Sequence, residues 1–167
     1  RLKITAENIT IISSGYGGTF YAGITLLTLL RQKKLPCGTI YDAPRFSWRG
    51  QHLDTARHFY QPDTITALLD LMAMFKLNRF HWHFADDEAF RIPLETLPEL
   101  TEKLEMRGEG KFLPALFSGA PVQGGQYPKE KVRSIIDHAA KLNIEVLPEI
   151  EAPAHALALA KVFPDTR

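Results

Sequence analysis

The feature that most constrains the fold is an alternation of strand-like and helix-like segments in the second part of the chain. Residues 46–53, 79–84 and 144–150 are predicted to form short strands. Between them, residues 62–76 and 128–142 carry apolar side chains at helical spacing and open with a proline, which suits a first helical turn. Strands that alternate with helices predict parallel strands joined by right-handed crossovers, as in a doubly wound sheet or an eightfold α/β barrel.

Polar and charged residues gather where each predicted strand ends. Residues 49–54 lie on or after the first strand, residues 86–88 follow the second, and residues 149–155 follow the third. Barrel enzymes keep their active sites at the carboxyl ends of their strands. The glycine cluster at residues 15–18 lacks the spacing of a phosphate-binding loop, which disfavours a dinucleotide-binding sheet. We therefore expect an α/β fold of the (β/α)8 barrel type.

The remaining segments have shorter or less regular patterns. They are a strand or hairpin over residues 3–14, helices over residues 19–32, 97–104 and 155–162, a linker over residues 33–45, and an irregular loop over residues 108–126. The 167 residues hold about three barrel units, whereas a closed barrel needs roughly 250 residues. The chain starts without Met and stops soon after a helix-like segment, so we expect both ends to be cuts in a longer protein.

Composition excludes some classes of partner. A net charge of +1, with basic and acidic residues interspersed, gives no footprint for nucleic acid or an anionic membrane, so neither partner is expected. The longest apolar run, residues 22–30, is too short to span a bilayer. The single cysteine, Cys37, cannot form an internal disulfide and is predicted to be a buried structural thiol.

Three sequence words carry a resemblance to a known family. They are DAPRFSWRGQHLDTARHF at residues 42–59, MAMFKLNRFHWHFADDEAFR at residues 72–91, and EVLPEIEAPAH at residues 145–155. In this order they resemble glycoside hydrolase family 20, the β-N-acetylhexosaminidases. The resemblance implies that residues 1–40 are the end of a small non-catalytic α/β domain and that residues 41–167 begin a barrel domain that is truncated here.

The resemblance also implies an activity. Enzymes of this family release terminal β-linked N-acetylglucosamine or N-acetylgalactosamine with retention, and the substrate's own acetamido oxygen is the nucleophile. The expected partner is therefore an oligosaccharide or glycan that ends in an N-acetylhexosamine. Related enzymes are often exported, which suggests a periplasmic or secreted location.

Particular residues take roles by similarity. Arg49 of the WRG word is expected to hold ring hydroxyls, because a guanidinium can bind two adjacent hydroxyls at once. A salt bridge to a neighbouring acid is the plainer alternative for Arg49. Asp86 and His155 are expected to form a relay toward the catalytic acid, while Asp87 and Glu151 are expected to contact substrate; the resemblance leaves the roles of Asp86 and Asp87 interchangeable. Glu151 stands where the family more often has Asp.

The pair His81 and His83 supports a rival hypothesis. Residues two apart on a strand point the same way, and this spacing suits a metal ion, as in a metal-dependent barrel hydrolase. Such a site needs further histidine or carboxylate ligands on later strands, which the chain is expected to lack. We therefore favour histidines that are hydrogen-bonded in the barrel interior, and expect no metal and no cofactor. Trp82 and Phe84, on the opposite face, are predicted to pack beneath a helix.

The catalytic pair of the family is missing from the sequence. In the family it is an adjacent Asp-Glu in a Gly-x-Asp-Glu word on the fourth strand, and no such word follows Ile150. We expect the pair to lie beyond Arg167 and the chain alone to be inactive. A module that binds sugar or another protein without catalysis is the alternative. Open strand edges should pair with the remainder of the barrel or with a second copy.

Overall fold

The computed structural model describes residues 1–33, 35–116 and 119–166. Its first part is an antiparallel sheet packed on a helix: strands β1 (Leu2–Ile4), β2 (Ile9–Ile11) and β3 (Gly38–Ile40) have the order β2-β1-β3, and helix α1 (Tyr16–Arg31) lies between β2 and β3 in sequence. Of the two alternatives for residues 3–14, a strand or a hairpin, the structure has the hairpin. The linker prediction for residues 33–45 is wrong, because β3 pairs there with β1. Its three residues lie between Pro36 and Pro44, and those prolines dominated the pattern.

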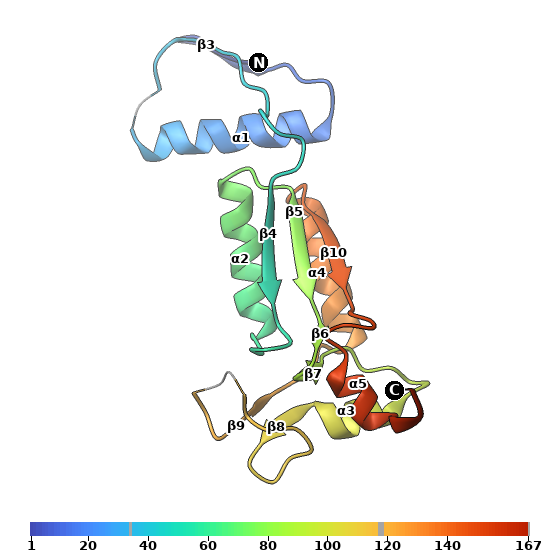
Figure 1. The fold of residues 1–167 in the computed structure, drawn as a ribbon. Helices are drawn as coiled ribbons and strands as arrows, with labels where there is room; N and C mark the ends of the chain where they lie inside the picture. Colours follow the sequence, from blue (N-terminus) through green and yellow to red (C-terminus); the bar gives the residue numbers. More distant parts are fainter. Residues whose placement is uncertain (34, 117–118, 167) are drawn as a thin grey trace.

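Helix α1 begins earlier than its periodicity predicted. Gly17 and Gly18 are helical rather than part of a turn. A Cβ at Gly18 would lie 2.8 Å from Cβ of Ser13, so only glycine lets the helix start so close to the end of β2. Figure 1 shows α1 lying across the amino ends of the strands that follow.

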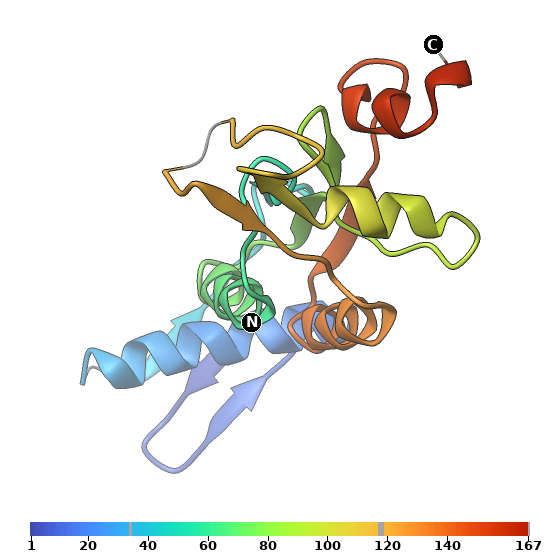
Figure 2. The same cartoon turned by 90° about the horizontal axis from the view of Figure 1, so that it is seen from below.

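The second part is a parallel sheet of three strands. Strands β4 (Gly50–Asp54), β5 (Arg79–His83) and β10 (Glu145–Glu149) have the order β10-β5-β4. Helix α2 (Pro62–Met74) connects β4 to β5, and helix α4 (Lys129–Lys141) precedes β10. The two helices lie side by side in Figure 2, seen nearly end-on. This is the predicted alternation of parallel strands and helices.

One face of this sheet forms the main core. Phe80, Trp82 and Phe84 of the β5 segment are at most 1% exposed and pack against apolar side chains of α2 and α4. The prediction that Trp82 and Phe84 lie beneath a helix is therefore confirmed. Truncating such an aromatic side chain to alanine costs about 3–5 kcal/mol. Because side chains alternate along a strand, the core on this face directs His81 and His83 to the other one.

The strand predicted over residues 46–53 starts only at Gly50. Phe46 and Trp48 precede it and are 61% and 59% exposed. Cys37 is also exposed, so the prediction of a buried thiol is wrong. Among the described residues, no helix has the length and apolar character needed to cross a membrane.

The segment between β5 and α4 builds a cap at the carboxyl ends of the strands. It contains β6 (Ala85–Asp86), β7 (Ala89–Phe90), α3 (Pro98–Leu104), β8 (Met106–Gly108) and β9 (Val122–Gly124). Helix α5 (Leu157–Val162) and the short helix η1 (Pro164–Thr166) follow β10, and α5 packs on α3. The prediction of an irregular loop over residues 108–126 is wrong in part, because β8 and β9 pair as an antiparallel hairpin.

Buried Arg91 joins the cap to the sheet. Its guanidinium donates hydrogen bonds to the carbonyl groups of Thr55, Ala56, Glu105 and Gly125. Burial, followed by repulsion from Arg107, lowers the pKa of Arg91 to about 10. Arg91 therefore stays charged near neutral pH, and its charge is compensated by carbonyl dipoles from three separate segments.

Candidate functional site

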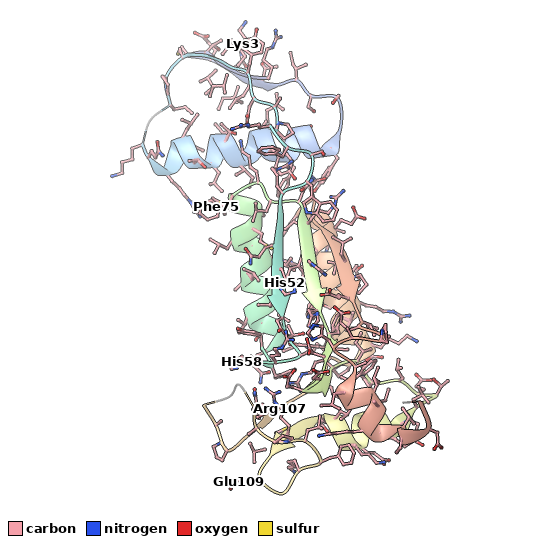
Figure 3. The ribbon with its side chains drawn as sticks, in the orientation of Figure 1. Lys3, His52, His58, Phe75, Arg107 and Glu109 are labelled. Atoms are coloured by element: carbon pink, nitrogen blue, oxygen red, sulfur yellow. The ribbon has the colours of Figure 1, made fainter. Side chains whose placement is uncertain are left out.

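The carboxyl half of the parallel sheet presents two layers of side chains on the face opposite α2 and α4. The register places His52 of β4 beside His81 of β5. Two residues closer to the carboxyl ends, it places Asp54, His83 and Glu149 side by side. In Figure 3, His52 lies about half way along β4. Because side chains alternate in a strand, these residues share one face.

Three imidazoles surround one carboxylate oxygen in this face. Glu149 Oε2 lies 2.5 Å from His83 Nδ1, 2.9 Å from His81 Nε2 and 3.6 Å from His52 Nε2. Burial opposes a charge on His83, but hydrogen bonds to Glu149 and Asp86 outweigh it and raise its pKa. Burial likewise opposes the charge of Glu149, yet the bond to His83 prevails and lowers its pKa.

Both nitrogens of His83 are engaged, since Nε2 lies 2.8 Å from Asp86 Oδ2. His83 and His81 therefore both have carboxylate partners, Glu149 for both rings and Asp86 for His83. The expectation that the chain lacks further ligands beside His81 and His83 is wrong: His52 and Glu149 lie next to them. Sequence spacing could not show this, because only the register of three strands separated by long segments brings the groups together.

Arg57 holds the acids together beyond the strand ends. Its Nη1 lies 2.8 Å from Asp54 Oδ2, its Nη2 lies 2.6 Å from Asp86 Oδ2, and its Nε lies 3.5 Å from Glu88 Oε2. Asp54 also accepts the backbone N–H of Arg57, which fixes the turn after β4. The Arg57 side chain is 36% exposed, so it meets solvent as well as the acids.

Asp86 and His155, the predicted relay, are brought together by the structure. His155 Nδ1 lies 3.3 Å from Asp86 Oδ1, and it also lies 3.3 Å from Arg57 Nη2. Asp86 is 2% exposed, whereas the His155 side chain is half exposed. The buried acid thus faces a histidine that solvent can reach.

The two acids expected to contact substrate differ in their surroundings. Asp87 Oδ1 accepts a hydrogen bond of 2.9 Å from the backbone N–H of Leu157, so it anchors the loop after β10. Glu151 lies in that loop, partly exposed. A cleft of about 600 Å³ beside the loop is lined by Asp87, His155 and apolar residues 152, 153, 156, 157, 159 and 160.

Arg49 lies at the opposite end of the sheet. It precedes β4, and its Nε and Nη1 donate to the carbonyl groups of Lys76 and Phe46, at 2.7 and 2.6 Å. Its guanidinium carbon lies 5.3 Å from the ring centre of Tyr21 in α1. Strand β4 separates Arg49 from the acids by roughly 15 Å. The structure therefore gives Arg49 a bridging position between α1 and the sheet, away from the clustered acids, and the sugar contact predicted for it stays a prediction. Within residues 1–33, 35–116 and 119–166, no acid forms the alternative salt bridge with Arg49, and its Nε and Nη1 face carbonyl groups instead.

Sequence reasoning missed Arg57, although a signal was present. Asp54 and Arg57 are three residues apart directly after a strand, in a region where a turn brings such residues together. Behind them, buried Arg107 Nη2 donates to the Arg57 carbonyl, as does Gln123 Nε2 at 3.2 Å. Both donors come from the hairpin β8–β9, which the sequence did not predict.

Carboxylates, imidazoles and an arginine gathered beyond the ends of parallel strands define an enzyme-like site on an α/β fold. A family model described as glycosyl hydrolase family 20, catalytic domain, matches residues 46–167, and one described as domain 2 of the same family matches residues 1–43. The chain therefore belongs to glycoside hydrolase family 20.

Relatives from Vibrio illustrate the similarity. A β-hexosaminidase from Vibrio furnissii is 38% identical over 169 residues, which cover 98% of this chain and 28% of that protein. An N,N'-diacetylchitobiase from Vibrio harveyi is 38% identical over 168 residues, covering 94% of this chain and 19% of that protein. A family 20 exo-β-N-acetylglucosaminidase from Vibrio harveyi, solved with N-acetylglucosamine, matches with a TM-score of 0.92 at 37% identity, covering 98% of this chain and 27% of that one. The chain thus spans less than a third of each relative.

Proposed function

We propose that the chain contributes the sugar-binding part of a β-N-acetylhexosaminidase, which removes terminal β-linked N-acetylglucosamine or N-acetylgalactosamine by retaining, substrate-assisted hydrolysis. Its partner would be an oligosaccharide or glycan that ends in such a sugar. Family membership and the names of the relatives support this activity. The observation that carries it is the cluster of Arg57, Asp86 and His155 beyond the parallel strands.

The same proposal assigns the two parts of the chain. Residues 1–40 would be the end of a non-catalytic α/β domain, and residues 41–167 the first three strand-and-helix units of a (β/α)8 barrel. Three parallel strands in the order β10-β5-β4, with helices on one face and polar side chains on the other, support it.

Arg57 takes the role first predicted for Arg49. A guanidinium has five N–H donors in a fixed fork, and the acids around Arg57 engage only part of them. The remaining donors can bind hydroxyls of the terminal sugar. Asp54, Asp86 and Glu88 hold the fork in one orientation, so little side-chain entropy would be lost on binding.

Asp86 and His155 are proposed to act as a relay. The buried Asp86 carboxylate can fix the tautomer and orientation of the His155 ring, and the half-exposed ring can then hydrogen-bond a catalytic carboxyl placed next to it. Asp87 is proposed to hold the loop that carries His155, through its bond to Leu157. Glu151 remains a candidate for direct contact with substrate.

The chain supplies no Gly-x-Asp-Glu word in its 167 residues, so the catalytic pair would have to come from outside it. We therefore propose that the isolated chain does not hydrolyse N-acetylhexosaminides. Binding of sugar without turnover is the alternative function, and the same arginine and acids would serve it.

Titration of the isolated chain with N-acetylglucosamine, followed by NMR, tests the role of Arg57. The wild type is expected to bind the sugar. Arg57→Ala is expected to bind it at least about 10-fold more weakly, because hydrogen bonds from a charged group contribute about 1.5–3 kcal/mol. Arg133→Ala is the matched control, since Arg133 is exposed on α4 away from the site.

The remaining outcomes separate the alternatives. Arg49→Ala should leave binding unchanged if the chain stays folded by circular dichroism. Equal loss in Arg133→Ala and Arg57→Ala, or unchanged binding in Arg57→Ala, would contradict the proposed role. Turnover of a chromogenic N-acetylglucosaminide by the pure chain would show that a catalytic pair is present within it.

A further inference from the structure

Among the described residues, one group of metal-binding atoms lies on the face of the parallel sheet opposite α2 and α4. It consists of one nitrogen each from His52 and His83 and one oxygen from Glu149, and these atoms all lie within 4.8 Å of one another. They come from three different strands, β4, β5 and β10. We propose that His52, His83 and Glu149 form a binding site for a divalent transition-metal ion, with zinc as the favoured ion.

The donor set fits zinc chemically. Zinc is bound by imidazole nitrogen at about 2.0–2.1 Å and by carboxylate oxygen at about 2.0–2.2 Å, and a set of three protein ligands leaves one position for water. Tetrahedral ligands at such distances lie about 3.3 Å apart. Glu149 Oε2 lies 2.5 Å from His83 Nδ1 and 3.6 Å from His52 Nε2, and these two separations bracket that value.

The surroundings of His83 supply a second, independent reason. Histidines that bind metals usually donate their other N–H to a carboxylate, which fixes the tautomer and strengthens the ligand. His83 Nε2 lies 2.8 Å from Asp86 Oδ2, and Asp86 is itself held by Arg57 at 2.6 Å. His83 is thus oriented with Nδ1 toward Glu149 and with its N–H toward a buried, anchored acid.

The ligating carboxylate also has an outer partner. His81 Nε2 lies 2.9 Å from Glu149 Oε2, and the His81 ring contacts the His52 ring with centroids 4.8 Å apart. His81 therefore lies beside the site, where it can donate to the bound carboxylate. Two imidazoles and one carboxylate select Zn²⁺ or Co²⁺ over Mg²⁺ or Ca²⁺, which prefer oxygen ligands.

The proposal is tested by titrating the metal-free 167-residue chain with Zn²⁺, in the Cys37→Ser background so that the exposed thiol cannot bind the ion. Calorimetry should show one site per chain with a Kd below about 10 μM. Co²⁺ should give the visible bands of a four-coordinate ion without a thiolate band, and Mg²⁺ should not compete.

Substitutions then locate the site. His52→Gln and Glu149→Gln should each weaken Zn²⁺ binding at least 10-fold, and Asp86→Asn should weaken it by about 10–100-fold through His83. His138→Gln is the control, because His138 pairs with Asp70 on the helices and lies outside the cluster. His52 is half exposed, so its replacement should leave the fold intact, as circular dichroism can check.

Two results would overturn the proposal. One is the absence of saturable Zn²⁺ binding to the wild type, which would leave the cluster as a network of shared protons. The other is Zn²⁺ binding that His52→Gln and Glu149→Gln do not change, or that His138→Gln weakens equally. All measurements are made without sugar, so they are independent of the proposed hydrolase function.

Discussion

At the scale of single residues, Glu88 is the acid with the least favourable surroundings. It is 7% exposed, and among the described residues its Oε2 has no hydrogen-bond partner. Burial raises the pKa of Glu88, and the charge of Asp86 raises it further, while Arg57 and Arg107 act in the opposite direction. The ionised form of Glu88 therefore lowers the stability of the fold. In return, its carboxylate helps to orient Arg57 at the site.

A pH dependence follows from the raised pKa of Glu88. A carboxyl whose folded-state pKa lies above its unfolded value of 4.5 contributes stability that is complete below that value. The contribution is lost as the pH rises through the folded pKa. The free energy of unfolding of Glu88→Gln should therefore increase relative to that of the wild type as the pH is raised from 4 to 7, as measured by urea denaturation.

Glu130→Gln is the control, because Glu130 is exposed in the first turn of α4. A pH-dependent change of the same size in Glu130→Gln would show that the effect does not arise from the burial of Glu88. A Glu88→Gln curve that runs parallel to that of the wild type from pH 4 to pH 7 would show that burial does not perturb this carboxyl.

The positions of Arg49 and Arg57 show that a sequence motif does not determine which arginine lies at the carboxyl end of a strand. Both arginines lie in one word of the family resemblance, eight positions apart. The word predicted a strand and an arginine at a sugar site, but the strand runs only from Gly50 to Asp54 and so separates the two side chains. The exact start of the strand decides which arginine reaches the carboxyl end, and periodicity cannot fix that start.

At the scale of elements, the hairpin β8–β9 positions the turn that carries Arg57. Arg107 of β8 and Gln123 of β9 both donate to the Arg57 carbonyl. The hairpin depends on glycine where its strands approach the end of α3. Gly124 has a φ of +152°, and a Cβ there would lie 2.0 Å from the carbonyl oxygen of Glu105.

Gly124→Ala should therefore disturb the hairpin and, through it, Arg57. We expect a loss of about 1–3 kcal/mol in the free energy of unfolding, because the backbone conformation is unfavourable for alanine and the added methyl has no room. N-acetylglucosamine should bind more weakly as well. Urea denaturation and the NMR titration measure the two effects.

Gly23→Ala is the matched control. Gly23 lies inside α1 with open space around its Cβ position, so alanine should stabilise the helix by up to about 1 kcal/mol. If Gly124→Ala is as stable as wild type, the strands β8 and β9 do not depend on this close approach.

Elements with a sustained pattern could be predicted, and those without one could not. Helices α2 and α4 have whole apolar faces, and strand β5 alternates Phe80 and Trp82 with histidines, so their type and order were predictable. Strands β3, β8 and β9 have three residues each, too few to show a period. They form because neighbouring chain segments offer hydrogen bonds, which is a property of the fold and not of local sequence.

At the scale of the whole molecule, α1 is fastened to the amino end of the parallel sheet. Lys76 after α2 bonds to Thr25 of α1 at 2.7 Å and to Asp42 at 2.6 Å. Tyr16 of α1 donates to the carbonyl of Lys141 at the end of α4. The clustered acids and Arg57 lie at and beyond the carboxyl ends of the strands, and Figure 1 shows that these ends point away from α1.

Both outer strands of the parallel sheet have an unpaired edge in the described residues. In the described part of the chain, β4 and β10 each pair along one edge only. Ile150, directly after β10, is 54% exposed. Unpaired strand edges beside exposed apolar side chains favour pairing with another chain. This supports the expectation that the remainder of a barrel, or a second copy, covers these edges.

The isolated chain should therefore associate as its concentration rises, which analytical ultracentrifugation can measure. Ile150→Lys places a charge at the open edge and should shift the equilibrium toward monomer, because a lysine opposes strand pairing with a second copy. Ile136→Lys is the control, since Ile136 is 43% exposed on α4, away from both edges. A wild-type chain that stays monomeric at all concentrations would show that these edges do not drive association. Equal shifts in both variants would assign the association to general apolar exposure, because the charge at the edge would then have no effect of its own.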